Sequence, residues 1–400
     1  MLRLILGVAG TGKSTEIYRR IADRNLESGP TMLLVPEQYS FESERALYEL
    51  LGARRAQSVQ VLSFTRLCHK IFYQYGQVAG EFVTQAGKYL LMSLALEQVR
   101  DRLNVYRAQS ERASFVPVAL ELAAEFKNAG AVPETVLKAA ETCEDERLRD
   151  KLGELGVIYQ AYQALLERGY RDPADDIARA MRLSTGRGAF RGAAVYIDSF
   201  AAFLAPELQF IQRMLEEGAD VTVALCCDGR RGNVFAPVNE TIRRLQHAAR
   251  RAGAAVETPL LLETPYRAKN EALRYLCQNY LCDTIPFDGE QDAIHVAAAG
   301  DVFEEAEWIA RRINALVYDE GYRFREIAVI TRSLPAYTDA FETAFARCHI
   351  PVYFDRRENA EHDEAANLIL TALLSVRSSY DTAQIVSLAK LPLLGLAEED

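Results

Sequence analysis

The chain opens with Leu2-Arg3-Leu4-Ile5-Leu6-Gly7-Val8-Ala9-Gly10-Thr11-Gly12-Lys13-Ser14-Thr15, and this stretch decides its fold. It predicts a buried strand, a G-x-x-x-x-G-K-S loop and then a helix, which together make a P-loop. In such a loop the backbone N–H groups surround a phosphate, and the amino end of the helix adds its dipole. Lys13 would reach the β- and γ-phosphates of ATP, and the Ser14 hydroxyl would bind Mg²⁺. The predicted cofactor-binding residues here are Gly7, Gly10, Thr11, Gly12, Lys13, Ser14 and Thr15. The alternative is a glycine-rich turn without a ligand.

Composition narrows the class of protein. Four hundred residues, 49% of them apolar, are enough for two or three domains with real cores. With 46 basic and 56 acidic residues the net charge is −10, so the whole chain shows no bias toward nucleic acid. Any nucleic-acid surface must therefore be local.

Cysteine usage and hydropathy predict a soluble, cytoplasmic protein without membrane contact. The seven cysteines include no C-x-x-C pair, so we expect reduced packing residues rather than disulfides or a zinc site. No apolar run approaches the ~20 residues of a membrane span, and no leader precedes the strand at Leu2.

Apolar runs recur along the chain and alternate with helical patterns. Strands are predicted at 32–35, 59–62, 193–197 and 221–225, with helices after them. This alternation indicates an α/β fold with a parallel sheet and helices on both faces. Ligands bind such sheets at the carboxyl ends of the strands.

Two further regions complete the prediction. Between residues 80 and 189 only helical patterns occur, which indicates an all-α insertion that ends near the Gly- and Arg-rich stretch 187–192. After it come a basic helix at 240–252, whose arginines suit a solvated face, a short strand near Val256 and a loop-like connection.

A second α/β unit is predicted from about residue 292. Its strands are expected at 294–298, 327–332 and 352–354, and its helices at 303–320 and 335–347. Two such units in tandem would hold a nucleotide in the cleft between them. The sequence stops soon after two more helical patterns without a capped ending, so we expect a fragment of a longer chain.

Three side chains complete the predicted nucleotide chemistry. Asp198 follows a buried strand, where a P-loop enzyme keeps the carboxylate that orients Mg²⁺, although aspartate also opens many turns. Ser199 stands where helicase-type ATPases place a glutamate to activate water, so hydrolysis is doubtful. Arg332 follows a predicted strand of the second unit and is either an arginine finger or a surface arginine.

The loops after three predicted strands carry equipment for DNA. Aromatic rings stack on splayed bases, amide and guanidinium groups bond to base edges, and hydroxyls suit phosphates. Each ring has packing in the core as its alternative. The candidate DNA-binding residues are Gln38, Phe41, Ser63, Phe64, Thr65, Arg66, Phe200 and Phe203.

Several segments together resemble a known family. They are GVAGTGKST at 7–15, LLVPEQYSFESERAL at 33–47, VLSFTRL at 61–67, VYIDSFAAFLAPE at 195–207 and EEAEWIARRINALVYDEGYRFREIAVITR at 304–332. In this order and spacing they resemble the amino-terminal part of AddB, the B subunit of the bacterial AddAB-type ATP-dependent helicase–nuclease. The resemblance covers nearly the whole chain and is weakest between Gly229 and Asp292.

The resemblance implies a superfamily-one helicase layout. Residues 1–79 and 190–291 would form a first RecA-like P-loop domain, 80–189 its helical insertion, and 292–400 the start of a second RecA-like domain. Two departures count against a working motor: only six residues precede Gly7, and Asp198-Ser199 replaces Asp-Glu. The nuclease domain and iron–sulfur cysteines of the family would lie beyond Asp400, so the fragment alone should cut nothing.

The resemblance also implies a role. The B subunit pairs with a motor and nuclease A subunit at double-strand DNA ends, in homologous recombination, and scans the 3′-ended single strand for the Chi sequence. By motif, Gln38, Phe64, Arg66 and either Phe200 or Phe203 correspond to the Chi-contacting positions. The alternatives are an active superfamily-one helicase and an unrelated P-loop NTPase such as a kinase.

Overall fold

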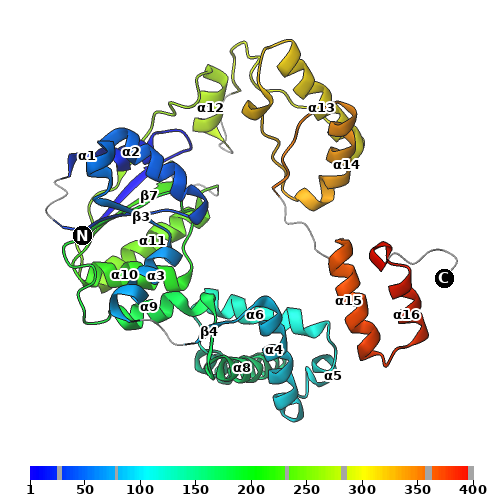
Figure 1. The fold of residues 1–400 in the computed structure, drawn as a ribbon. Coiled ribbons are helices and arrows are strands. Elements are labelled where there is room, and N and C mark those ends of the chain that lie inside the picture. Colours follow the sequence, from blue (N-terminus) through cyan, green and yellow to red (C-terminus); the bar gives the residue numbers. More distant parts are fainter. Residues whose placement is uncertain (25–28, 77–79, 230–233, 281–285, 356–362, 395–400) are drawn as a thin grey trace. The chain divides into compact units, whose positions relative to one another are not determined.

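A computed structural model of the chain describes residues 1–24, 29–76, 80–229, 234–280, 286–355 and 363–394. They divide into two compact units, Met1–Ile294 and His295–Asp400. The first unit holds a six-stranded sheet and a helical block, and the second is helical in its described part (Figure 1). No helix in these described ranges combines the length and apolar character needed to cross a bilayer.

The sheet of the first unit is parallel. Its strands, in the spatial order β3-β2-β6-β7-β1-β8, pair only in parallel among the described residues. They are β1 (Leu2–Gly7), β2 (Thr31–Leu34), β3 (Val59–Leu62), β6 (Ala194–Ile197), β7 (Asp220–Cys226) and β8 (Leu260–Leu262). The α/β class and the parallel sheet predicted from the sequence are confirmed. Because all strands point the same way, the loops that follow them gather along one edge.

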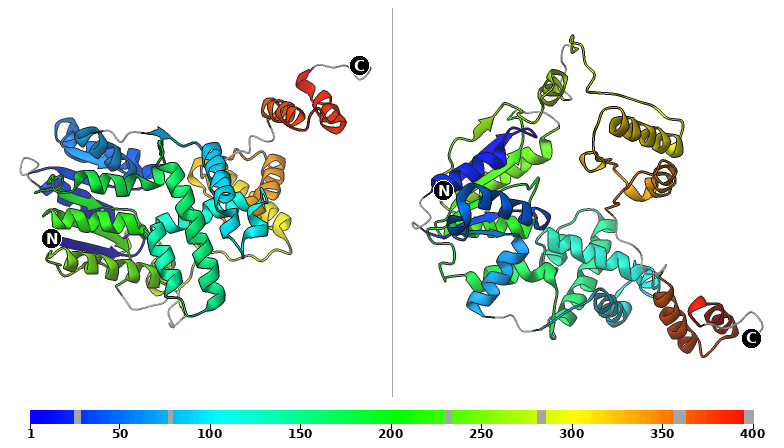
Figure 2. Two further views of the ribbon diagram at one scale, coloured as in Figure 1. Left: turned by 90° about the horizontal axis from the view of Figure 1, so that it is seen from below. Right: turned by 45° about the horizontal axis from the view of Figure 1, so that its top comes forward.

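Helices cover both faces of the sheet, as Figures 1 and 2 show. Leu4, Val195 and Val223 point to one face, and Ile5, Leu33 and Ala224 point to the other. On the first face lie α3 (Phe64–Tyr75), α9 (Asp176–Ser184), α10 (Ala205–Glu216) and α11 (Ala236–Arg251). On the second lie α1 (Lys13–Asp23) and α2 (Ser40–Ala56). The near-continuous apolar runs of the strands are therefore explained by burial on both faces.

The helical block follows the prediction with one addition. It contains α4 (Gln85–Val99), α5 (Arg107–Ser110), α6 (Phe115–Asn128), α7 (Pro133–Glu141) and α8 (Glu146–Leu166), packed around a core of their own. The addition is a parallel pair of two-residue strands, β4 (Glu81–Phe82) and β5 (Tyr170–Arg171). Two residues show no periodicity, so the sequence pattern could not reveal them. The α9 helix, predicted as part of this insertion, instead packs Ala180 into the core under the sheet.

A buried ionic network lies where the block meets the sheet. Lys127 Nζ bonds to Asp172 at 2.7 Å and to Asp175 at 2.9 Å. Nearby, Arg171 pairs with Asp176 at 3.0 Å, and its guanidinium carbon lies 4.3 Å from the centre of the Phe72 ring of α3. These contacts tie the helical block to the sheet.

The sixth strand differs from the prediction. It was expected near Val256, but Val256 makes only an isolated bridge to Leu2, and the strand is β8 at Leu260–Leu262. Pro259 and Pro265 bracket that triplet and made it resemble a loop. Beyond it lies α12 (Glu271–Asn279).

The predicted strands of the second unit are wrong for the described residues. Its helices are α13 (Val302–Tyr318), α14 (Leu334–Arg347), α15 (Glu364–Arg377) and α16 (Thr382–Ala389). The segments 294–298, 327–332 and 352–354 carry no strand assignment. A strand requires ladder partners, which an apolar run alone does not guarantee. Here Ile327 and Phe354 pack instead against the cluster formed by α13 and α14.

Candidate functional site

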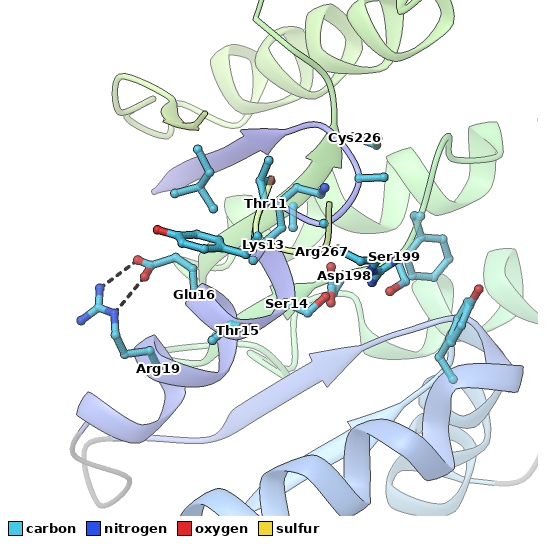
Figure 3. A pocket seen from close by; sticks show the side chains of 18 of the residues that line it. Thr11, Lys13, Ser14, Thr15, Glu16, Arg19, Asp198, Ser199, Cys226 and Arg267 are labelled. Carbon is cyan, nitrogen blue, oxygen red and sulfur yellow. Dashed lines mark hydrogen bonds and ion pairs between the residues drawn. The ribbon is translucent and has the colours of Figure 1, made fainter. Parts of the chain in front are cut away.

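The glycine-rich loop between β1 and α1 lines a cavity of about 940 Å³ in the first unit. Gly10, Thr11, Gly12, Lys13, Ser14 and Thr15 all line it, and Asp198 faces them from the end of β6. Figure 3 shows Ser14 beside Asp198. The structure therefore brings together the cofactor-binding residues predicted from sequence, except that Gly7 contributes through its backbone rather than as a lining residue.

Glycine is required at two positions of this loop. Gly10 has φ +79°, and a Cβ there would lie 2.6 Å from the Cβ of Arg267. A Cβ on Gly7 would collide with the Thr11 hydroxyl oxygen. At the start of α1 no side chain caps the helix, so its first N–H groups face the cavity without a side-chain acceptor. Such a cradle, ahead of a helix amino end, suits an anion.

Lys13 is held inside the loop. Its Nζ donates to the carbonyl of Gly7 at 2.9 Å and to that of Val8 at 2.8 Å. Burial lowers the pKa of Lys13, the charges of Cys226 and Asp198 partly oppose this, and Arg267 adds to the lowering. A half-buried cation against carbonyl oxygens is poised to exchange them for phosphate oxygens.

The carboxylate and hydroxyl opposite Lys13 have the chemistry of magnesium ligands. Asp198 is only 4% exposed, and its N–H donates to the carbonyl of Leu34 at 3.0 Å, which fixes the loop after β6. Ser14 and Asp198 offer hard oxygen donors, which Mg²⁺ prefers. Ser199 follows in a left-handed conformation, φ +66°, unusual for serine.

Sequence reasoning missed several residues of the cavity. Tyr266 and Arg267 reach it from the loop after β8, and the Arg267 N–H donates to the Gly10 carbonyl at 3.3 Å. Tyr39 and Cys226 line it as well. The signal was present, because Tyr266 and Arg267 follow an apolar triplet as the other site loops follow their strands.

The predicted DNA-binding loops adjoin one another at the same edge of the sheet. The turn η2 (Glu37–Tyr39) follows β2, and its Glu37 accepts a hydrogen bond from Arg66 Nε at 2.9 Å. Ser63 caps α3 by accepting a bond from the Arg66 N–H at 3.2 Å. The Phe64 ring meets the Phe200 ring with centroids 5.6 Å apart. The loops after β2, β3 and β6 therefore form a single contiguous region.

Burial divides the candidate DNA residues into two groups. Phe64 and Phe203 are 5% and 7% exposed and belong to the core, so their rings support the loops from below. Ser63 is also buried. The candidate residues that are exposed to solvent are Gln38, Phe41, Thr65 and Arg66, together with the half-buried Phe200. Phe41 is 74% exposed, which is unusual for a large apolar ring and suits a stacking surface.

The remaining predictions concern Arg332 and the cysteines. Arg332 is exposed in the second unit, and its role as an arginine finger stays a prediction. Cys68 and Cys227 are buried, as packing residues should be, while Cys143, Cys226, Cys277 and Cys348 are partly exposed. Cys282 lies outside the described residues. Burial raises the pKa of Cys68 to about 12, which keeps that thiol protonated.

Comparison with known proteins gives a consistent result. The family described as "ADDB, N-terminal" matches residues 4–276. The B subunit of an ATP-dependent helicase/deoxyribonuclease from Clostridium botulinum (strain Langeland) is 28% identical over 414 residues, covering 100% of this chain and 36% of the relative. A protein of the same description from Acetivibrio thermocellus is 29% identical over 412 residues, with the same coverage. One from Clostridium perfringens (strain SM101) is 30% identical over 368 residues, covering 89% of this chain and 32% of the relative. The chain thus spans about a third of the length of these curated relatives.

Proposed function

We propose that this chain, which belongs to the ADDB amino-terminal family, is the nucleotide-binding and DNA-reading part of a helicase–nuclease B subunit. The relatives are described as the B subunit of an ATP-dependent helicase/deoxyribonuclease. The observation that carries the proposal is the continuity of the loops after β2, β3 and β6 with the cavity around Lys13. In this proposal the parallel sheet of the first unit and the helices on its two faces form a RecA-like P-loop domain, and the helical block is its insertion.

Nucleotide binding is assigned to the Lys13 cavity. ATP would place its β- and γ-phosphates on the loop 7–14, with Lys13 exchanging its two carbonyl bonds for phosphate oxygens. Mg²⁺, when bound, would neutralise phosphate charge between Ser14 and Asp198. Arg267 would add a further cation near the phosphates, since it lines the cavity and its backbone N–H bonds to the Gly10 carbonyl. Tyr266 offers a ring for the base.

ATP is bound rather than rapidly hydrolysed in this proposal. A general base must lie within reach of the attacking water, and the position after Asp198 is a serine whose hydroxyl cannot accept a proton at neutral pH. The protein would therefore use ATP weakly or as a structural ligand. Unwinding would depend on the motor A subunit of the heterodimer.

DNA reading is assigned to the exposed members of the loop region. Arg66 and Gln38 would bond to base edges or phosphates, and Phe41 and Phe200 would stack on bases. Phe64 and Phe203 would hold Phe200 in place, since their rings lie 5.6 and 5.3 Å from it. By its resemblance to the family, the strand read is the 3′-ended single strand, and the sequence recognised is Chi.

The test combines two measurements on the full 400-residue chain. Binding of Mg²⁺-ATP with negligible turnover, unchanged by single-stranded DNA, supports the proposal, whereas strong DNA-stimulated hydrolysis supports an active helicase motor instead. In parallel, Arg66→Ala should weaken binding of a 3′-ended oligonucleotide. The control Arg45→Ala removes an arginine that pairs with Glu49 on the surface of α2 and should leave binding unchanged. Equal binding by both variants and the wild type would refute the DNA assignment.

A further inference from the structure

Two carboxylates form ion pairs with the guanidinium of Arg66. Glu37 accepts from Arg66 Nε at 2.9 Å, and Glu44 accepts from Nη1 at 3.4 Å. The second carboxylate oxygen of Glu37 accepts a short hydrogen bond from the Ser63 hydroxyl. Two of the three nitrogens with which an arginine binds a phosphate or a guanine edge therefore already have acidic partners.

Folding alone gives a weak reason for this arrangement. The side chains of Arg66 and Glu37 are 47% and 59% exposed, and exposed ion pairs contribute little to stability. Glu37 also stands next to Gln38, in the turn that the proposed function assigns to DNA. A carboxylate placed there repels a phosphate backbone and competes with it for the same donors.

We propose that Glu37 is a specificity-determining residue that masks Arg66 from DNA of the wrong sequence. The inference rests on the proposed function, because it assumes that Arg66 contacts DNA. A DNA strand binds the Arg66 guanidinium only when groups of the DNA replace the hydrogen bonds to the carboxylates. A poorly matched strand leaves the Glu37–Arg66 ion pair intact. Glu37 thereby lowers affinity for random DNA more than affinity for the recognised sequence. Discrimination by an opposing group of this kind is a common route to specificity.

The charge of Glu37 is removed by Glu37→Gln, which keeps the shape of the side chain and a carbonyl acceptor. The probe is a fluorescent (dT)20 oligonucleotide, which carries no mixed sequence, titrated into the full chain. We expect binding to tighten about two- to fivefold, the range that exposed ion pairs span. The dependence of log affinity on log salt should steepen by about 0.7, the value for one added phosphate contact on a single strand.

Two controls make the result specific. Glu49→Gln removes a carboxylate that pairs with Arg45 at 2.9 Å on the surface of α2, and it should leave (dT)20 affinity unchanged. In an Arg66→Ala background, Glu37→Gln should lose most of its effect, because the group that it unmasks is gone. Thermal unfolding of each variant shows whether the fold is intact.

The outcomes separate the inference from the proposed function. If Arg66→Ala weakens (dT)20 binding but Glu37→Gln leaves it unchanged or weaker, Glu37 is a structural brace and the masking inference is refuted. If Arg66→Ala has no effect, the proposed DNA site itself fails. In selection from a random 20-nucleotide pool, the wild type should enrich a sequence more strongly than Glu37→Gln. Equal enrichment by the two proteins would also overturn the masking role.

Discussion

Replacing Lys13 by methionine should abolish tight nucleotide binding while leaving the fold nearly as stable. The two carbonyls that Lys13 holds each keep another donor. Cys227 N–H donates to the Gly7 carbonyl at 3.2 Å, and the Thr11 hydroxyl donates to the Val8 carbonyl at 2.9 Å. The loss of two shared hydrogen bonds should therefore cost folding at most about 1 kcal/mol.

The charge of Lys13 also works against folding. Burial, opposed in part by Cys226 and Asp198, holds the pKa of Lys13 below its ordinary value of 10.5. The folded protein then binds fewer protons than the unfolded chain between the two pKa values, so stability rises with pH across that window. Below that window, where lysine is charged in both states, the charged lysine destabilises the fold. Its removal should offset part of the lost hydrogen bonding.

The loss of affinity for phosphate in Lys13→Met is not offset in this way, because no other group replaces the ammonium. A charge-assisted hydrogen bond contributes about 1.5–3 kcal/mol, so Mg²⁺-ATP should bind about ten- to 150-fold more weakly to Lys13→Met. Calorimetric titration measures this loss, and thermal unfolding should show a change in Tm within about 4 °C. The matched control is Lys70→Met, which removes another half-buried lysine whose pKa burial also lowers. Unchanged ATP affinity in Lys13→Met would refute the loop as the phosphate site, and a collapse of Tm would show that Lys13 holds the fold instead.

Three further predictions follow from buried charges. Asp198→Asn should lower the affinity for Mg²⁺-ATP while leaving metal-free ADP binding unchanged, measured by the same titration; an equal loss for both ligands would contradict a magnesium role. Burial alone would raise the pKa of Asp172, but Lys127, Lys88 and the Ala174 N–H together outweigh it and bring the value to about 2, from 3.8. A carboxyl whose pKa is lowered in the folded state stabilises the fold above pH 3.8. In urea titrations the free energy of unfolding of the wild type should therefore exceed that of Asp172→Asn by about 2 kcal/mol at neutral pH, and the difference should vanish as the pH falls toward 2. A difference that stays constant with pH would argue against these ion pairs. Arg171→Ala leaves the buried Asp176, 3% exposed, with only its longer 3.4 Å pair to Arg179, and should cost about 1.5–3 kcal/mol in chemical denaturation. A loss below about 0.5 kcal/mol would show that this ion pair does not hold the helical block.

The order of strands and helices in the first unit was predictable for a physical reason. Strands buried on both faces require continuous apolar runs, and the runs at 32–35, 59–62 and 221–225 correspond to β2, β3 and β7. Because the strands of a parallel sheet end at a common edge, Lys13, Asp198 and the predicted DNA-binding loops could be expected to lie close together.

What the sequence could not supply was the direction of side chains and pairing across distance. Phe64 and Phe41 are the same residue type after neighbouring strands, yet one is 5% and the other 74% exposed. Periodicity does not show which ring points inward at a loop. The Glu37–Arg66 pair joins residues 29 positions apart, and it follows from the adjacency of β2 and β3 rather than from any local pattern.

The most direct test of the central claim is where a single DNA strand touches this chain. A 3′-ended oligonucleotide with 4-thiothymidine at successive positions, irradiated with the full chain, should crosslink to residues 36–41, 63–66 and 198–203. Crosslinks confined to the basic face of α11, at Arg243, Arg250 and their neighbours, would contradict the account, because DNA would then follow a different surface from the loops beside the Lys13 cavity.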